Sequence, residues 1–340
     1  MRAVKLRTLQ DIRLEEIPIP EIGPDEALVR MKACGICGSD TMDWYVEKKA
    51  PFYPGHEPAG VIEKVGSEVS NFKVGDRVFV HHHAPCFDCK FCLKKQYSIC
   101  PTWKASKIDP GGLAECFRVP AVNLRGDTLK LPDALSFEDG SLIEPTACVV
   151  KSFRKAGLKN AATILVIGLG VMGQMHILLG RHTGARKIIG ADLVPYRLEK
   201  ALEFGADAVI NVASENLIEK VTDLTGGQMA DVVIIGPGSI EAMDAGLSCV
   251  GNGGTALFFT PTPGNEFLQI NPFHLYFNEI NLIFSYSCGP NDTREAMELI
   301  EQGVITAEKL VTHTYTLDKA KRAIDKTIEA GESLKTLVVN

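Results

Sequence analysis

The sequence predicts a two-domain α/β protein in which a largely antiparallel β domain is joined to a doubly wound parallel-sheet domain. Two patterns within its 340 residues indicate this. Up to about residue 150, short apolar runs are interrupted by Gly, Pro and Asp, which is typical of a twisted antiparallel sheet. From residue 163 onward, continuous β-branched runs alternate with helical stretches, which is typical of parallel strands covered on both faces.

Each apolar run is expected to form one strand. The runs of the first domain are residues 27–31, 60–65, 77–80 and 115–119. The second domain has six runs, the full strand count of a doubly wound sheet, at residues 163–167, 187–189, 208–210, 231–235, 255–259 and 281–285. Helices near 293–302 and 317–330 and a strand at 335–338 are expected to follow.

The expected domain boundaries follow from these changes of pattern. Residues 1–150 form the first domain, with a cysteine-rich lobe at 86–100, and residues 151–287 form the second. Residues 288–340 return to the mixed character of the first domain and are expected to rejoin it, which makes the second domain an insertion. A helix near 146–156 is expected to bridge the two.

Composition excludes several classes of protein. A net charge of -6 argues against a nucleic-acid surface. No apolar run approaches the roughly 18 residues of a membrane span, and residues 1–10 do not resemble a signal peptide. We therefore expect a cytoplasmic protein with no nucleic-acid or membrane partner. Ten cysteines are many for that compartment, so several are expected to hold metal. Four of the cysteines are expected to be small apolar core residues instead, namely Cys116, Cys148, Cys249 and Cys288.

Four cysteines between residues 86 and 100 predict a closed zinc site. Cys86, Cys89, Cys92 and Cys100 have the spacing C-x2-C-x2-C-x7-C. Four thiolates at about 2.3 Å complete a tetrahedron and leave no position for water or substrate. Such an ion organises a lobe and does not catalyse. Disulfides are the alternative, and they do not suit the expected compartment.

A glycine-rich turn follows the first run of the second domain and predicts a dinucleotide-binding (Rossmann) site. Its residues are Gly168, Gly170, Val171, Met172 and Gly173, before a helix at 174–182. The glycines permit a tight turn, a close approach of the pyrophosphate and close helix packing. Asp192, at the end of the second run, is expected to accept hydrogen bonds from the adenosine ribose and to repel a 2′-phosphate. NAD is therefore expected over NADP, although Arg197 lies near and would favour NADP.

The first domain contains a second group of metal-ligand types. Cys34 and Cys37 stand before Ser39 and Asp40, and the dipeptide His56-Glu57 follows nineteen residues after Cys37. Thiolate, imidazole and carboxylate all bind zinc. The cysteine pair could also be half of a zinc knuckle or a redox pair, but no second pair completes a knuckle and no thioredoxin-like pattern precedes it. The triplet 81–83 is all histidine, yet successive side chains alternate faces and are not expected to converge on one ion.

These signatures together resemble the zinc-containing medium-chain dehydrogenases, the superfamily of alcohol, sorbitol and threonine dehydrogenases. The segments at 34–40, 55–66, 86–100 and 168–173 occur in the order of that family, and the resemblance covers essentially the whole length of the chain. The resemblance implies a GroES-like catalytic domain, one catalytic and one structural zinc per chain, and homodimers or homotetramers.

The resemblance also implies roles for individual residues. Cys37 and His56 match catalytic zinc ligands, and either Glu57 or Glu144 matches the third. Glu144 stands where animal alcohol dehydrogenases have a cysteine, which favours a polyol-like substrate. Asp40 matches the acid that orients the imidazole ligand.

Proton transfer is expected to depart from the family pattern. Ser39 matches the hydroxyl that starts the family's proton relay. Many members have a histidine three residues further on, where this chain has Met42, so water or another acid must complete the relay.

The function expected from these observations is NAD-dependent oxidation of a secondary alcohol, a polyol, sugar alcohol or cyclitol. A threonine-type amino-alcohol dehydrogenase remains an alternative. An enoyl reductase of the same superfamily is disfavoured because that branch commonly lacks the zinc ligands. A non-catalytic nucleotide-binding or zinc scaffold is the alternative from another class. The last strand, 281–285, is expected at an open sheet edge, where pairing with a second copy would form a dimer.

Overall fold

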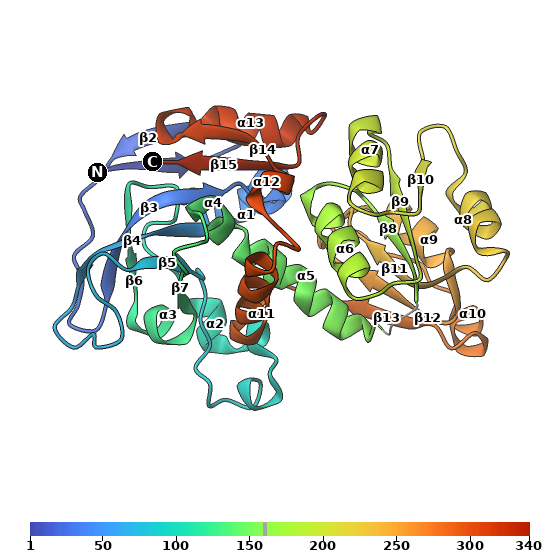
Figure 1. Ribbon diagram of the computed structural model, residues 1–340, viewed down its shortest axis with the longest axis horizontal. Coiled ribbons are helices and arrows are strands. Elements are labelled where there is room, and N and C mark those ends of the chain that lie inside the picture. Colours follow the sequence, from blue (N-terminus) through green and yellow to red (C-terminus); the bar gives the residue numbers. More distant parts are fainter. Residues whose placement is uncertain (159–161) are drawn as a thin grey trace. The chain divides into compact units, whose positions relative to one another are not determined.

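The computed structural model describes residues 1–158 and 162–340 (Figure 1). They form two compact units. Unit 1 comprises Met1–Ala147 with Cys288–Asn340, and unit 2 comprises Cys148–Ser287. Helix α5 (Ile143–Ala156) contains the boundary between them. Within the described ranges no helix has the length and apolar character needed to cross a membrane.

Unit 1 is built on a largely antiparallel sheet with the strand order β14-β15-β3-β4-β5-β7, in which β6 also pairs with β3. A separate antiparallel pair is formed by β1 (Arg2–Leu6) and β2 (Ile12–Glu16). The strands of the sheet are β3 (Ala27–Gly35), β4 (Pro58–Val65), β5 (Arg77–Val80), β6 (Cys116–Val119), β7 (Thr128–Lys130), β14 (Val311–Thr316) and β15 (Lys335–Val339). The antiparallel pairing of β15 with β3 returns the end of the chain to its beginning.

Short helices connect the strands of unit 1. Ser136 caps α4 by accepting a hydrogen bond from the backbone N–H of Asp139, and the Asp139 side chain bonds back to the Ser136 N–H. Figure 1 shows α13 beside β14 and β15, and α13 packs against both strands. The helices are α1 (Asp43–Lys49), α2 (Pro101–Ala105), α3 (Ala121–Gly126), α4 (Phe137–Ser141), α11 (Pro290–Glu301), α12 (Ala307–Leu310) and α13 (Ala320–Glu329). The 3₁₀ turns are η1 (Gly38–Thr41), η2 (Cys92–Lys94), η3 (Tyr97–Ile99) and η4 (Leu317–Lys319).

Unit 2 contains a six-stranded sheet in which every neighbouring pair is parallel. The strand order is β10-β9-β8-β11-β12-β13. The chain adds β9 and β10 on one side of β8, and then returns to add β11, β12 and β13 on the other side, which is the doubly wound arrangement. The strands are β8 (Thr163–Ile167), β9 (Lys187–Asp192), β10 (Ala208–Asn211), β11 (Ala230–Ile235), β12 (Val250–Phe258) and β13 (Asn281–Phe284). All five residues of β8 are buried, as expected for a central strand.

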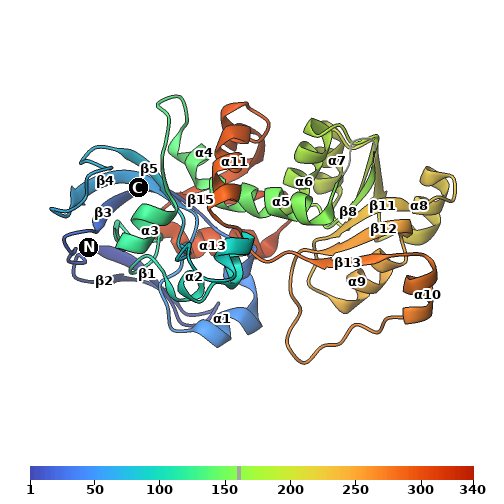
Figure 2. The same ribbon diagram turned by 90° about the horizontal axis from the view of Figure 1, so that it is seen from below.

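Helices lie on both faces of this parallel sheet. Figure 2 shows α6 and α7 on one side and α9 on the other. Helix α6 packs against β8 and β9, α7 against β9 and β10, and α9 against β11 and β12. The helices are α6 (Val171–His182), α7 (Pro195–Glu203), α8 (Leu217–Thr225), α9 (Ile240–Leu247) and α10 (Pro272–Phe277).

The predicted fold class is confirmed, and the differences concern single elements. β12 begins at Val250 and β9 continues to Asp192, so both strands are longer than the runs that predicted them. β14 was not predicted, because its alternation of Thr with half-buried residues lacks a strongly apolar face. The prediction that the last strand lies at a sheet edge is confirmed, since within residues 1–158 and 162–340 β13 pairs only with β12.

Candidate active site

The four clustered cysteines lie together in one lobe of unit 1. Their sulfur atoms approach one another at 3.5 Å (Cys89 and Cys92), 3.6 Å (Cys100 and Cys86) and 3.9 Å (Cys86 and Cys92). Sulfurs at the corners of a tetrahedron around zinc are about 3.8 Å apart when the Zn–S distance is about 2.3 Å. Among the described residues, which include all ten cysteines, no disulfide is formed. The arrangement therefore fits a metal ion held by four thiolates and leaves no room for a further ligand.

The four cysteines pack around a buried tryptophan, and two of their thiols have shifted pKa values. Trp103, which is 1% exposed, packs against the cysteine side chains. Burial raises the pKa of the Cys92 thiol to about 12. At Cys100 burial acts in the same direction, but hydrogen bonds from the backbone N–H groups of Cys86 and Trp103 outweigh it and lower the pKa to about 6. The Cys100 thiolate is thus favoured even without a cation, whereas the Cys92 thiolate needs one.

A second group of ligand types forms where β3 ends and β4 begins. The two strands are antiparallel, with Cys34 opposite Pro58, and the Gly35 N–H donates to the Glu57 carbonyl at 3.3 Å. This register brings Cys37, just after β3, beside His56 and Glu57, just before β4. One ligand atom from each of the three lies within 4.8 Å of the other two.

A hydrogen bond orients the Cys37 side chain, and an ion-pair contact orients the side chain of His56. The Cys37 sulfur accepts from the Ser39 N–H at 3.5 Å and caps η1. Asp40, which is 4% exposed, places a carboxylate oxygen 3.7 Å from Nδ1 of His56. This leaves the other ring nitrogen for a metal, because a carboxylate on one nitrogen of a ligating histidine fixes its tautomer. Burial would lower the pKa of His56, but the charges of Asp40 and Cys37 raise it well above its usual value.

Glu57 is also half of a fully buried ion pair. Its carboxylate contacts Nζ of Lys335, at the start of β15, and both side chains are 1% exposed. Lys335 also donates to the Ile36 carbonyl at 3.1 Å. Burial would lower the pKa of Lys335, but the charges of Glu57 and Cys37 outweigh the effect of burial and raise that pKa. Gly35 makes room for the pair, since a Cβ there would lie 1.7 Å from the carboxylate.

Glu144 lies with two of the three successive histidines. Ligand atoms of Glu144, His81 and His82 lie within 4.8 Å of one another. The expectation that the triplet does not converge was therefore wrong for His81 and His82. It holds for His83, whose Nδ1 contacts the Ser106 carbonyl and which is not part of the group. The His82 ring is 5.0 Å from the ring of His56, so this group adjoins the Cys37 group.

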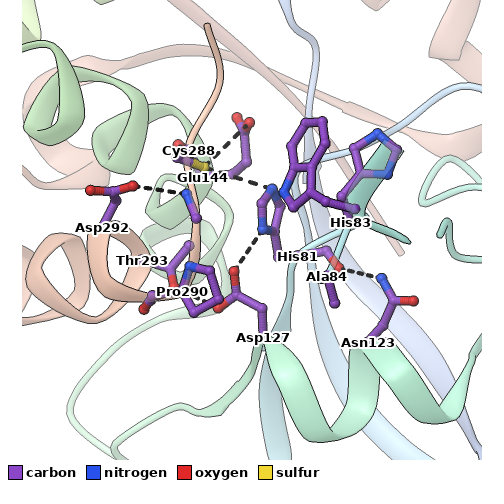
Figure 3. Close-up of polar contacts among 12 residues, drawn as sticks. His81, His83, Ala84, Asn123, Asp127, Glu144, Cys288, Pro290, Asp292 and Thr293 are labelled. Atoms are coloured by element: carbon purple, nitrogen blue, oxygen red, sulfur yellow. Dashed lines mark hydrogen bonds and ion pairs between the residues drawn. The ribbon is translucent and has the colours of Figure 1, made fainter. Parts of the chain in front are cut away.

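His81 is held by a buried network that the sequence did not indicate (Figure 3). Its Nδ1 is 2.7 Å from a carboxylate oxygen of Asp127, whose other oxygen accepts from the Thr293 hydroxyl at 2.6 Å. Its Nε2 is 3.7 Å from the sulfur of Cys288, which is 3.8 Å from the Glu144 carbonyl. Cys288 is fully buried, as expected of a core residue, and it also contacts His81 and Glu144. Cys116 and Cys249 are buried as expected, whereas Cys148 is only partly buried.

In unit 2 the glycine turn connects β8 to α6. Gly168 has a φ of +83°, and a Cβ at Gly173 would lie 2.1 Å from the Gly168 carbonyl oxygen, so both positions require glycine. At Gly170 a Cβ would meet the Arg197 guanidinium at 3.9 Å, an ordinary van der Waals distance. Nε of Arg197 is buried without a hydrogen-bond partner in the described part of the chain. A guanidinium beside a glycine backbone at the start of a helix fits a dinucleotide phosphate.

Asp192 has more partners than its sequence position indicated. Its carboxylate accepts from the N–H groups of Leu169 at 2.6 Å and Val194 at 2.9 Å, and lies 3.7 Å from Arg197. It therefore stabilises the glycine turn itself. A carboxylate has about four acceptor sites, so capacity for a ribose hydroxyl remains.

A parallel-sheet unit with this turn, together with thiolate, imidazole and carboxylate groups in the other unit, defines a dehydrogenase that uses a dinucleotide and a metal. Comparison with known proteins agrees. Residues 23–133 match the alcohol dehydrogenase GroES-like domain and residues 171–302 match the zinc-binding dehydrogenase domain. The chain is 33% identical to the sorbitol dehydrogenase of Bacillus subtilis, over 99% of this chain and 97% of that protein.

Solved structures show the same architecture. The 2R,3R-butanediol dehydrogenase of Bacillus subtilis has a TM-score of 0.87 and 25% identity, covering 100% of this chain and 99% of that one. A short chain alcohol dehydrogenase of Escherichia coli CFT073, complexed with NADH, has a TM-score of 0.89 and 25% identity, with the same coverage. The chain belongs to the zinc-containing medium-chain dehydrogenase family. It is an oxidoreductase, so the non-catalytic scaffold is set aside.

Proposed function

We propose that the protein oxidises a secondary alcohol of a polyol, sugar alcohol or cyclitol and transfers the hydride to NAD. The observation that carries this proposal is the cluster of Cys37, His56 and Glu57 in a family of dehydrogenases. A relative named for sorbitol and a structural neighbour named for butanediol support a substrate with several hydroxyl groups.

Two zinc ions per chain are part of this proposal. Cys86, Cys89, Cys92 and Cys100 would hold the structural ion, because their sulfur spacing matches a tetrahedron. Cys37, His56 and Glu57 would hold the catalytic ion. We favour Glu57 over Glu144 as third ligand, because an oxygen of Glu57 lies within 4.8 Å of the Cys37 and His56 ligand atoms. Its two oxygens allow one to bind the metal while the other remains paired with Lys335.

When bound, zinc supplies the Lewis acidity that lowers the pKa of a substrate hydroxyl, and the nicotinamide supplies a hydride acceptor. The protein's own residues provide orientation and charge balance. Asp40 holds the His56 ring in one tautomer, and Lys335 offsets the charge of Glu57. Ser39 lies next to Cys37 and is partly exposed, so its hydroxyl is available to receive the substrate proton. Met42 cannot carry that proton further, and water or another acid must do so.

For the cofactor, we propose NAD over NADP. The Asp192 carboxylate lies at the end of β9, beside the glycine turn, where its charge would repel a 2′-phosphate. Arg197 lies near Gly170 and would contact the phosphates. We also propose that the protein is a homodimer in which β13 of one chain pairs with its copy. Phe284 on this edge strand is 63% exposed, and such an edge needs a partner.

We propose that the protein acts in the cytoplasm, because its ten cysteines form no disulfide among the described residues, which suits a reducing compartment.

A substrate panel tests the proposed function. The zinc-loaded protein would be assayed with polyols, cyclitols, simple secondary alcohols and β-hydroxy amino acids, each with NAD and with NADP. The proposal predicts the highest kcat/KM for a polyol or cyclitol with NAD. A preference for threonine would instead support the amino-alcohol alternative, and the absence of turnover with any alcohol would contradict the proposal.

A further inference from the structure

The three successive histidines after β5 have different environments. His81 is 0% exposed, and its Nδ1 is 2.7 Å from the Asp127 carboxylate. The Nδ1 of His83 contacts the Ser106 carbonyl, and its ring packs 4.2 Å from that of Trp103. Both outer rings therefore have a hydrogen-bonding partner within the protein. The ring of His82, which lies between them in the sequence, is 5.0 Å from the ring of His56.

His82 has a buried nitrogen with no partner. Its Nδ1 makes no hydrogen bond among the described residues. A buried polar atom without a partner destabilises the fold, so such an atom commonly marks a place where a ligand binds. The side chain as a whole is partly exposed, which lets a ligand reach it.

The surroundings of His82 indicate what kind of ligand this is. One of its nitrogens lies within 4.8 Å of an oxygen of Glu144, and its ring lies 5.0 Å from that of the proposed metal ligand His56. Two hydrogen bonds of about 2.8 Å that meet at one oxygen span about 4.6–4.8 Å. A hydroxyl between the two side chains can accept from the imidazole N–H and donate to the carboxylate, whereas a methyl group there can do neither.

We propose that His82, together with Glu144, binds the hydroxyl adjacent to the carbon that is oxidised, and that His82 thereby selects vicinal diols over simple secondary alcohols. This inference rests on the proposed function, because the reacting carbon is placed by the metal at Cys37 and His56. The flanking contacts of His81 with Asp127 and of His83 with Ser106 hold the backbone of His82 in place, which is what a selective site requires.

The test compares wild type, His82→Phe and His82→Gln on substrates with and without the adjacent hydroxyl. Sorbitol and the separate stereoisomers of butane-2,3-diol are the vicinal diols, and butan-2-ol is the matched alcohol. Phe preserves a planar ring without hydrogen bonds, and Gln restores an N–H donor. His182→Phe, at the exposed end of α6, is the control. Zinc per chain is measured by plasma mass spectrometry. The shift of the melting temperature that each alcohol causes in the zinc-loaded protein with NADH gives a readout independent of turnover.

The inference predicts that His82→Phe lowers kcat/KM for the diols about 10- to 100-fold, changes it for butan-2-ol less than about threefold, and keeps two zinc ions per chain. The diol-induced melting shift is lost with Phe, and Gln recovers part of both effects. The control behaves as wild type.

Equal losses on diol and butan-2-ol, or no loss on either, would overturn the role of His82. Loss of a zinc ion in His82→Phe would show a metal ligand instead. A wild type that oxidises butan-2-ol but no vicinal diol contradicts both the inference and the polyol substrate of the proposed function, whereas equal losses in His82→Phe contradict the inference alone. A wild type inactive on every alcohol contradicts the proposed function, and with it the inference.

Discussion

The buried pair of Glu57 and Lys335 allows a quantitative prediction. Replacing Lys335 by Met keeps an unbranched side chain of the same length up to Cε but removes the ammonium, and so leaves the Glu57 carboxylate buried without its cation. Both side chains are 1% exposed, so water cannot take the place of the ammonium. Breaking a buried pair by removing one partner costs about 3–5 kcal/mol. For a unit of roughly 200 residues this corresponds to a decrease of roughly 10 °C in melting temperature.

The assay is thermal unfolding of protein freed of metal with a chelator, because zinc would otherwise offset the free Glu57 charge. Lys321→Met is the matched control, since Lys321 and Asp325 form an exposed ion pair on α13. The control Lys321→Met should lower the free energy of unfolding by less than about 1 kcal/mol. The double variant Glu57→Gln with Lys335→Met should recover more than half of the loss, because no uncompensated charge remains. A loss in Lys335→Met no larger than in the control, or a double variant as unstable as the sum of its single changes, would refute the reasoning.

Three further predictions concern unit 2. Asp192→Ala should weaken the binding of NAD and improve the use of NADP relative to NAD, because the charge that repels a 2′-phosphate is gone. An unchanged ratio of the kcat/KM values for the two cofactors would contradict that role. His176 is buried and its Nδ1 contacts the Met172 carbonyl, so burial lowers its pKa to about 4, below the unfolded value of 6.5. The unfolded chain then binds more protons between these values, and about 3 kcal/mol of stability is lost as the pH falls from 6.5 to 4. Urea unfolding of His176→Gln should show a correspondingly smaller loss over that window, and pH profiles parallel to wild type would disprove this. Phe284→Asp should halve the mass seen by light scattering, whereas Ile218→Asp on α8 should not; a monomeric wild type at micromolar concentration rules the dimer out.

The sequence predicts those features that depend on local spacing. Four cysteines within fifteen residues and three glycines after a buried run determine their own geometry, because few residues separate the groups that meet. The same holds for the strand and helix that flank the glycine turn, which lie where their apolar runs predicted.

Contacts that depend on strand register over long separations could not be predicted in this way. Lys335 contacts the backbone of Ile36 across 299 positions of the chain, and only the pairing of β15 with β3 brings them together. The bond between Asp127 and Thr293 depends on the return of the final segment to unit 1. His82 was passed over because alternation along an ideal strand was assumed, whereas the triplet begins after β5 has ended.

The central claim is that one chain holds two zinc ions with different roles, and metal counting on paired variants tests it most directly. Wild type should contain two zinc ions per chain by plasma mass spectrometry. Cys37→Ala should contain one, unfold cooperatively near the wild-type temperature and show no turnover, because the open site carries chemistry and little folding energy. Cys89→Ser should lose the other ion and melt at a lower temperature, because metal binding there stabilises the lobe. Full activity of metal-free protein, or a Cys37→Ala variant that retains two zinc ions, would contradict the account.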